Sequence, residues 1–367
     1  MNILFIGGQD FPGIGGIESY MHNISISLLR KGHNVTIISK GKVENRISVD
    51  GIMVINKKSS GHGLLSWLLF KFKALKYIIV NRRNIDIVND HIGTFSYIVK
   101  PVLKMFGSKV CFTMHSFAKD STKYGNFQRK LLSLNSKIAM RVIGDDIITV
   151  SKSKANEIKK QYGSVPQIIP CGINIYNKID SHKILDDHHI TVGNYFLTIS
   201  RIDPIKNLDV LILAFKKANI KDKQLVIAGD YNNYYGNELR ELAKDNKNII
   251  FVGSVIGTDK EILLQNCYAN CLLSSSEGMP IALLEAMAYA KPCIVTDIPA
   301  IRDILQDDWG YWCKVRNVDD TCMQLLSIVS DDQKNNNQEI KEYVTREHSW
   351  DNIAEKFLNH LYAKYLN

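Results

Sequence analysis

Residues 270–297 read NCLLSSSEGMPIALLEAMAYAKPCIVTD, and they combine a strand pattern, a helix pattern and a second strand pattern. The apolar runs at the two ends are short, whereas the middle, about residues 282–289, has the composition of a helix. A strand, a helix and a strand in this order build a parallel sheet that is covered by helices. The segment therefore predicts an α/β fold.

The same alternation continues through the rest of the chain. The runs that predict strands are NILFI, NVTIIS, IMVIN, DIVND, KVCFTM, DIITV and QIIP, followed after residue 193 by YFLTIS, QLVIAG and NIIFVG. Helical patterns separate them, and they centre on residues 17–31, 64–82, 127–141, 208–217, 237–245 and 259–266, with a further helix opening at the cap-like Ser151. The polar stretch 174–193 lacks periodicity and is typical of a connection between domains. We expect two Rossmann-like, doubly wound domains, residues 1–175 and 176–349, with a cleft between them.

Charge is distributed unevenly along the chain. Residues 1–175 carry 25 basic and 10 acidic side chains, whereas the remainder carries 21 basic and 27 acidic ones. A basic half beside an acidic half indicates an anionic partner for the first domain, such as a phospholipid surface, a lipid pyrophosphate or nucleic acid. No aromatic-interleaved basic strand or known nucleic-acid motif is present, so we do not expect nucleic acid.

Two features bear on location. The chain begins directly with an apolar strand pattern and no basic leader, so we expect a cytoplasmic protein, at most at the inner face of the membrane. Lys71, Lys73 and Lys76 interrupt the longest apolar stretch, which excludes a membrane span there. A sheet-covering helix whose lysines reach solvent is favoured over a membrane-surface helix. The seven scattered cysteines are typical of reduced, buried thiols, and the Cys267/Cys271 pair lacks nearby histidines for a zinc site.

Glu277 and Glu285 stand eight residues apart across the strand-to-helix turn of the segment quoted first. At a rise of 1.5 Å per residue, the turns between them separate the carboxylates by roughly 10 Å, the distance from a hexose to a nucleotide ribose. Gly278 allows close approach of backbone, and a helix start offers unpaired amides, here those of Met279, Ile281 and Ala282, to a diphosphate. Pro280 suits the first helical position. A solvated, capped core helix is the alternative interpretation.

This motif resembles the E-x7-E element of retaining glycosyltransferase family 4, whose members have the GT-B architecture, and the resemblance covers nearly the whole chain. It implies that Glu277 contacts sugar hydroxyls and that Glu285 contacts the ribose. SRIDPIKN matches the family's paired cations at Arg201 and Lys206, which would neutralise the departing diphosphate. The final helix, residues 350–366, is similar to the helix that returns to complete the first domain.

Further matches are shorter. Gly15 and Gly16 in GGQDFPGIGGIES correspond to the family's glycines beneath the donor phosphate, and this loop is not a dinucleotide fingerprint because Glu18 takes the place of its last glycine. His115 in FTMHSF matches a family histidine that faces the reacting sugar. Ser254 and Val255 in FVGSV match the segment that contacts the nucleotide base. PCGIN departs from the family pattern at Cys171, where asparagine is usual.

The resemblance implies a hexosyltransferase of the bacterial surface-polysaccharide type. We expect it to move a hexose or N-acetylhexosamine from a nucleotide diphosphate sugar to a glycan or lipid-linked acceptor, as in O-antigen, capsule or lipopolysaccharide synthesis. A UDP-sugar is the favoured donor, and GDP-mannose is the second candidate. The chain contains no D-x-D, which agrees with donor binding without metal or other cofactor. A sugar-nucleotide epimerase of the same architecture is the alternative function.

Overall fold

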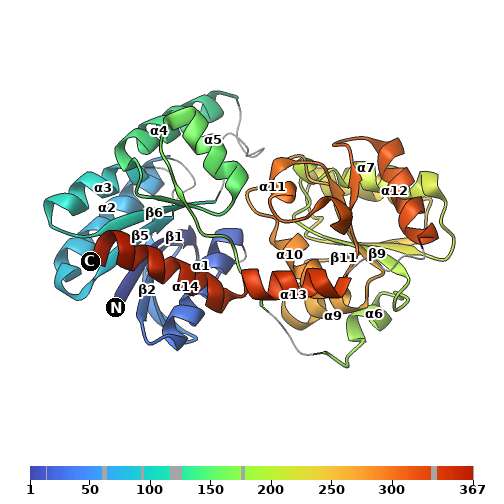
Figure 1. Ribbon diagram of the computed structural model, residues 1–367, viewed down its shortest axis with the longest axis horizontal. Helices are drawn as coiled ribbons and strands as arrows, with labels where there is room; N and C mark the ends of the chain where they lie inside the picture. Colours follow the sequence, from blue (N-terminus) through green and yellow to red (C-terminus); the bar gives the residue numbers. More distant parts are fainter. Residues whose placement is uncertain are drawn as a thin grey trace. The chain divides into compact units, whose positions relative to one another are not determined.

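The computed structural model describes residues 1–13, 15–59, 64–91, 95–115, 126–174, 178–331 and 337–366. The chain divides into two compact units, and each is considered by itself. Unit 1 comprises Met1–Gly172 together with Trp350–Asn367, and unit 2 comprises Ile173–Ser349. In the ribbon, unit 1 is the blue-to-green part together with the red C-terminal helix, and unit 2 runs from green at residue 173 through yellow and orange to orange-red (Figure 1).

Unit 1 is built on an eight-stranded sheet with the order β3-β4-β2-β1-β5-β6-β7-β8. All neighbouring strands are parallel except β3, which pairs with β4 in the antiparallel direction. The strands are β1 (Asn2–Gln9), β2 (Asn34–Gly41), β3 (Asn45–Val49), β4 (Ile52–Lys58), β5 (Ile87–His91), β6 (Val110–Met114), β7 (Ile147–Thr149) and β8 (Gln167–Ile168). Their buried runs explain the apolar sequence patterns, since helices cover both faces of a parallel sheet.

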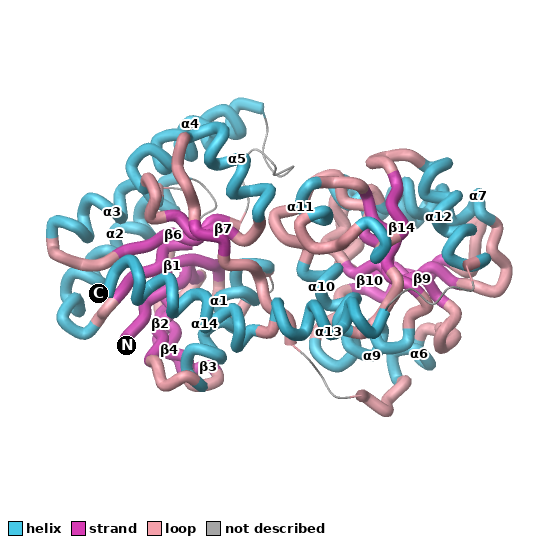
Figure 2. Tube along the Cα trace, in the orientation of Figure 1, coloured by secondary structure: helices cyan, strands magenta, loops and turns pink. Residues whose placement is uncertain are grey.

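Helices cover the two faces of this sheet separately. The helices are α1 (Gly16–Arg30), α2 (Leu64–Asn81), α3 (Ser96–Met105), α4 (Asn126–Ile143), α5 (Lys152–Tyr162) and α14 (Trp350–Leu361), with short turns at Arg82–Asn84 and Tyr362–Leu366. Side chains of α2, α3, α4 and α5 pack with Leu4 and Ile6 of β1. Phe5, which points to the other face, contacts Phe357 of α14, and α14 packs along α1. Helix α14 thus belongs to the core of unit 1 (Figure 2).

Unit 2 contains a six-stranded, fully parallel sheet with the order β11-β10-β9-β12-β13-β14. Its strands are β9 (Tyr195–Ile199), β10 (Gln224–Ala228), β11 (Ile249–Gly253), β12 (Ala269–Leu272), β13 (Cys293–Thr296) and β14 (Tyr311–Cys313). Its helices are α6 (Lys183–Asp187), α7 (Leu208–Ala218), α8 (Tyr234–Ala243), α9 (Gly257–Asn266), α10 (Ile281–Ala288), α11 (Pro299–Arg302), α12 (Val318–Ser330) and α13 (Asn337–His348), with single turns η3 (Pro204–Lys206) and η4 (Asp307–Trp309). The expected α/β class is confirmed in both units.

Three local expectations were wrong. The stretch 174–193 is more than a connection, because α6 forms within it and buries Ile184 and Leu185 in the core of unit 2. Helix α3, which contains Pro101, was missing from the predicted helices. Lys71 does not reach solvent: its side chain is 2% exposed and its Nζ lies 2.5 Å from Oδ1 of the buried Asp90. This partner comes from β5, nineteen residues further along the chain.

All seven cysteines are buried and none of them forms a disulfide, as expected. Within the described parts of the chain, none of the helices is both long and apolar enough to span a bilayer.

Candidate functional site

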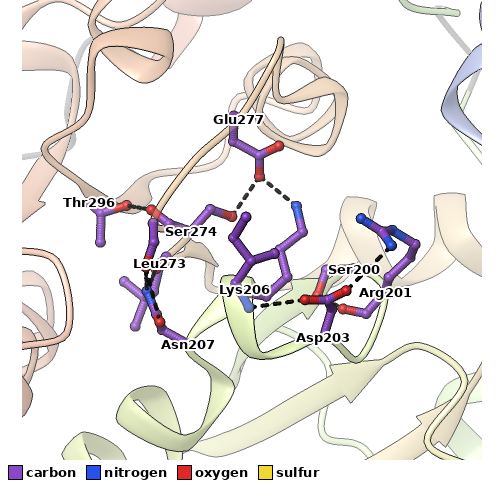
Figure 3. A network of polar contacts seen from close by, with 11 residues as sticks. Ser200, Arg201, Asp203, Lys206, Asn207, Leu273, Ser274, Glu277 and Thr296 are labelled. Carbon is purple, nitrogen blue, oxygen red and sulfur yellow. Dashed lines mark hydrogen bonds and ion pairs between the residues drawn. The ribbon is translucent and has the colours of Figure 1, made fainter. Parts of the chain in front are cut away.

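The first element of the site is the loop after β9, which places Lys206. Asp203 caps the turn η3 by accepting a hydrogen bond from the Ile205 amide at 3.1 Å, and its carbonyl accepts one from the Lys206 amide at 2.9 Å. With its backbone held in this way, Lys206 extends its side chain to Glu277, where Nζ lies 2.5 Å from Oε1 (Figure 3). The two charged groups are 71 residues apart in sequence.

Glu277 lies beyond the carboxyl end of β12. One further hydrogen bond reaches it from Ser274, and another holds Ser274 in place. The Ser274 hydroxyl donates to the same Oε1 at 2.6 Å, and the Ser274 carbonyl accepts a hydrogen bond from Thr296 Oγ1 of β13 at 2.6 Å (Figure 3). The side chains of Glu277 and Lys206 are only 13% and 15% exposed, so water screens their attraction weakly. Oε2 of Glu277 has no hydrogen-bond partner among the described residues and can accept one from a ligand hydroxyl.

Asn207 fastens the Lys206 loop to the Glu277 loop. Its Nδ2 donates to the Leu273 carbonyl at 2.6 Å and to the Ser275 hydroxyl at 2.8 Å, and it is fully buried. Its φ of +51° is in the left-handed region, which asparagine tolerates better than most residues. The Ser275 amide adds a bond to the Ile205 carbonyl at 2.8 Å. Asn207 is a positioning residue that the sequence analysis missed, because asparagine after a cation has no distinctive pattern.

Arg201 stands apart from this pair. Its guanidinium Nη1 lies 3.5 Å from Asp203 Oδ2, and its side chain is 65% exposed. It makes no bond to Lys206 or Glu277, although it begins in the same loop (Figure 3). The structure therefore brings one of the two expected cations to the carboxylate and leaves the other at the surface nearby.

Helix α10 begins beside this cluster, at Ile281. Pro280 precedes the helix instead of occupying its first position, and its carbonyl already accepts from the Leu283 amide at 3.0 Å. The amides of Gly278, Ile281 and Ala282 donate no hydrogen bond within the described chain, and all three residues are half-buried, as is Met279. Amides of this kind at the positive end of a helix dipole bind anions.

Glu285 lies one turn further along α10 and pairs with α9. Lys260 Nζ is 2.6 Å from Glu285 Oε1 and 3.5 Å from Glu261 Oε1. The Tyr289 hydroxyl donates to Glu261 Oε2 at 2.6 Å, and burial raises the pKa of Glu261 above its usual range. Lys260 thus holds the carboxylate that was expected to contact a ribose. No sequence pattern marks Lys260, because a lysine in a surface helix is common.

Ser254 and Val255 follow β11, the strand at the edge of the sheet. Ser254 is exposed, whereas Val255 packs against the same core as Met279, which precedes α10. The two expected neighbours of a base therefore lie immediately before α9, the helix that supplies Lys260.

In unit 1, His115 follows β6 and contacts His91 at the end of β5. His91 Nδ1 lies 2.9 Å from His115 Nε2, and Tyr20 packs its ring edge-on against both histidines. Burial lowers the pKa of His115 to about 4, so the imidazole is neutral at physiological pH. A neutral imidazole can donate or accept a hydrogen bond without adding charge.

The carboxylate of Glu18, a residue in the first turn of α1, lies against the loop before this helix. Helix α1 begins at Gly16 with Gly15 as its cap, as expected. Glu18 folds back into the loop, where its Oε1 accepts a hydrogen bond from the Gln9 amide at 2.8 Å. A Cβ on Gly15 would lie 2.2 Å from Glu18 Oε2, and one on Gly8 would lie 3.3 Å from Oε1. The glycines make room for Glu18, which the sequence analysis used only to exclude a dinucleotide fingerprint.

Within the described residues, no group of three or more His, Cys, Asp or Glu side chains is arranged to hold a metal ion. Unit 2 offers the ammonium group of Lys206, the amides at the start of α10 that have no partner among the described residues, and the ion-paired carboxylates of Glu277 and Glu285. This combination suits a ligand with a diphosphate between two hydroxyl-bearing groups.

The comparisons with known proteins agree with this chemistry. Residues 14–176 match the family model described as Glycosyltransferase Family 4, and residues 183–347 match the one described as Glycosyl transferases group 1. N-acetyl-alpha-D-glucosaminyl L-malate synthase of Bacillus anthracis is 25% identical over 91% of this chain and 90% of its own. Phosphatidyl-myo-inositol mannosyltransferase of Mycolicibacterium smegmatis is 25% identical over 91% and 86%. The Anabaena protein HepE, solved with UDP and glucose, has a TM-score of 0.77 and 16% identity over 99% of this chain and 100% of its own.

Proposed function

Because the chain belongs to the family 4 glycosyltransferases of GT-B fold, we propose that this hexosyltransferase moves a hexose or N-acetylhexosamine from a nucleotide diphosphate sugar with retention of configuration. The observation that carries the proposal is the Lys206–Glu277 pair beside the open start of α10. An ammonium group has three N–H donors, so Lys206 can bond a phosphate oxygen while it stays on Glu277.

The assignment of donor atoms follows the chemistry of each group. The diphosphate is placed at the amides of Gly278, Ile281 and Ala282, with Met279 alongside and Lys206 as the counter-cation. Glu277 Oε2 accepts from a sugar hydroxyl, and Glu285 accepts from the ribose hydroxyls. Arg201 is exposed in the present structure and is proposed to turn toward the diphosphate once the donor binds. In unit 1, His115 is assigned to the sugar, and Gly15 and Gly16 to the phosphate end of the donor.

In the proposed reaction, the bond between the anomeric carbon and the β-phosphate oxygen breaks first. Negative charge grows on the departing diphosphate, and Lys206 and the α10 amides stabilise that charge more in the transition state than in the ground state. The acceptor hydroxyl then bonds the anomeric carbon from the same face, and its proton passes to the departing phosphate. A double displacement through a covalent intermediate is not proposed, because the carboxylates of Glu277 and Glu285 are held by Lys206 and Lys260 and no further free carboxylate lies among the described residues of this cluster.

The donor base is proposed to be uracil, supported by the UDP and glucose in the HepE structure, and GDP-mannose is kept as the second candidate. A thermal-shift screen of UDP-, GDP- and ADP-sugars tests both choices, since a ligand raises the melting temperature according to its affinity. We expect a UDP-sugar to give the largest shift and Lys206→Ala to abolish it. Equal shifts for all nucleotides, or none, would contradict the assignment.

Donor binding is proposed to need neither a metal nor another cofactor, because amides and Lys206 supply the positive charge. Transfer should be unchanged in EDTA and should not rise when Mg²⁺ or Mn²⁺ is added. A loss of transfer in EDTA that either ion restores would overturn this part of the proposal.

The acceptor is proposed to be a glycan or lipid-linked glycan of bacterial surface polysaccharide synthesis, reached at an anionic membrane. Helix α3 packs against both α2 and α4, and these helices, together with the residues directly after α2 and α3, expose a mixed basic and apolar surface. Its apolar members are Leu65, Leu69, Phe72, Met105, Phe106, Leu134, Ile138 and Val142, and its basic members are Lys73, Lys76, Arg82, Arg83, Lys104, Lys137 and Arg141. Apolar side chains flanked by cations suit an interface with anionic lipids.

Sedimentation with vesicles tests this surface. We expect binding to phosphatidylglycerol vesicles at low salt, weaker binding to phosphatidylcholine, and a loss on Phe72→Ser. Leu213→Ser, which changes an exposed apolar residue of unit 2, is the matched control and should have no effect. Equal binding to both lipids would contradict the proposal.

The epimerase alternative is not favoured, because both family models describe glycosyltransferases.

A further inference from the structure

His91 has no place in the proposed reaction, yet it is the side chain that bonds His115. It ends β5, its side chain is 3% exposed, and its ring lies within 13° of parallel to that of His115, with centroids 5.1 Å apart. The short contact joins His91 Nδ1 to His115 Nε2 at 2.9 Å. One hydrogen atom lies in this contact, so only one of the two nitrogens can be the donor.

The surroundings of His91 are tightly packed. Phe5 meets its ring edge-on at 5.5 Å and Tyr20 does so at 5.6 Å. A Cβ on Gly7 would lie 2.8 Å from the His91 Cβ, so the glycine lets β1 pass this close. Nε2 of His91 is buried and has no hydrogen-bond partner among the described residues. Among the described residues, the ring therefore has a single polar contact, the one to His115.

Burial keeps both rings neutral, and the charge near His91 acts in the same direction. Burial, the neighbouring His115 and the Lys71 ammonium group hold the pKa of His91 well below its usual range. The nearest carboxylate in the sequence, Asp90, is committed to Lys71 in a buried ion pair. Tyr20 is the other titratable group against the rings, and burial raises the pKa of its hydroxyl far above neutrality. Neither ring gains a second proton near pH 7.

Two arrangements of the neutral pair are possible, and they differ in what remains at the buried Nε2 of His91. If His115 donated, His91 would carry its hydrogen on Nε2, and a buried N–H group would have no acceptor. If His91 donates from Nδ1, only a lone pair is left without a partner. Buried N–H groups without acceptors are rarer and costlier than acceptors with an unused lone pair. The second arrangement is therefore the stable one.

We propose that His91 is a positioning residue that donates from Nδ1 to His115 and so holds His115 as the tautomer with its hydrogen on Nδ1. His115 then presents an N–H donor on its free side and cannot act there as a base. The inference rests on the proposed function in assigning that donor to the sugar of the bound nucleotide sugar. It specifies the role: a hydrogen bond to a sugar oxygen, with no proton transfer.

Long-range ¹H–¹⁵N spectra of histidine-labelled protein report the tautomer without any substrate. We expect the His115 signals, assigned by their loss in His115→Gln, to show hydrogen on Nδ1 at pH 7. In His91→Asn, the side-chain amide can still donate from nearly the same position, so the tautomer should persist. In His91→Leu, where leucine has the shape of asparagine without its amide, the hydrogen should move to Nε2, the form that a free imidazole favours.

Turnover gives the second measurement. His91→Leu should lower kcat by about 10- to 100-fold with little change in KM for the donor, as expected when a contact group loses its orientation, and His91→Asn should recover most of it. Hydrogen on Nε2 of His115 in the wild-type protein would overturn the proposal even if His91→Leu does not fold. If the tautomer is as stated but His115→Gln transfers sugar normally, the proposed role of His115 fails and the positioning by His91 stands.

Discussion

Helices α10 and α1 both begin after a strand of a parallel sheet, and both starts contain glycine, but they differ in what fills them. At α10, the amides of Ile281 and Ala282 have no partner in the described chain, and Lys206 lies nearby on Glu277. At α1, the Glu18 carboxylate lies against Gly15 and accepts from the Gln9 amide. The positive end of the α10 dipole is therefore open to an anion, whereas the positive end of the α1 dipole already has the Glu18 carboxylate beside it.

The difference teaches that a glycine at a helix start does not by itself indicate a phosphate site. The Gly278 amide donates no hydrogen bond within the described chain, whereas Gly15 leaves room for a side chain three positions further on. A phosphate beside Gly15 would have to tolerate the Glu18 carboxylate. The role of Gly15 and Gly16 in binding the donor stays a prediction, and the experiments below separate it from a purely local one.

The largest effect is expected at α10. Lys206→Ala removes the cation that meets the growing charge on the diphosphate, and it should lower kcat by about 100- to 1,000-fold while the protein still folds. Glu277→Ala should have an effect of the same order, because it also frees Lys206 from its partner. Rates of transfer from the donor found in the thermal-shift screen provide the measurement.

Lys217→Ala is the matched control, since Lys217 is an exposed lysine of α7 that pairs with Asp319. It should keep the wild-type rate. Near-normal turnover in both Lys206→Ala and Glu277→Ala would show that the open start of α10 is not where the reaction occurs, and the contrast between the two helix starts would lose its functional meaning.

The second effect concerns the loop at α1. Gly15→Ala forces the end of the flexible Glu18 side chain to turn away from the Gln9 amide and should destabilise the protein by about 1 kcal/mol, although the extended backbone of Gly15 suits any residue. In a Glu18→Ala background the same substitution should cost almost nothing. Urea unfolding of the two single variants and the double variant measures this coupling.

Donor kinetics of the same variants decide the remaining question. If Gly15 only accommodates Glu18, the KM for the donor in the double variant should match that of Glu18→Ala. A rise in KM whenever Gly15 becomes alanine, whatever stands at position 18, would instead place the diphosphate against this glycine.

Local patterns were sufficient to predict most of the fold. Short apolar runs between helical segments marked every strand of both parallel sheets except β3 and β14, and Ser151 was correctly expected to cap a helix, since its side chain accepts from the Lys154 amide. What local patterns could not supply was the partner of a charge. Lys71 was expected at the surface, because Asp90 and the depth of the ion pair become visible only once β5 lies beneath α2.

The same limit explains the site. Lys206 and Glu277 could be named from their motifs, but not their bond across 71 residues. Asn207, Lys260 and His91 lack distinctive motifs. Asn207 holds the loop of Glu277, Lys260 holds Glu285, and His91 bonds His115. Residues that touch a ligand leave a pattern in sequence, whereas residues that hold them depend on packing between distant segments.

A smaller effect is expected where α9 supports α10. Lys260→Met keeps the length of the side chain but removes the charge that holds Glu285. The KM for the donor should rise about tenfold, the equivalent of one charge-assisted hydrogen bond of about 1.4 kcal/mol, while kcat changes little. Lys244→Met alters an exposed lysine that pairs with Glu241, and it should leave both constants unchanged. A fall in kcat alone would assign Lys260 to the reaction and not to ribose binding.

The smallest effect is on the pH dependence of stability. It concerns the strand ends near the two helix starts, where unit 2 has the charged Lys206 and Glu277 and unit 1 has the neutral His91 and His115. Burial lowers the pKa of folded His115 from 6.5 to about 4, so between these values the unfolded chain binds a proton that the folded chain does not. Stability therefore falls as pH drops through this window. Urea unfolding from pH 7 to pH 4 should show His115→Gln losing less stability than wild type, while His182→Gln, at an exposed position, follows wild type. Parallel curves for wild type and His115→Gln would mean that folded His115 binds a proton as readily as the unfolded chain does, so that burial does not keep its ring neutral in this window.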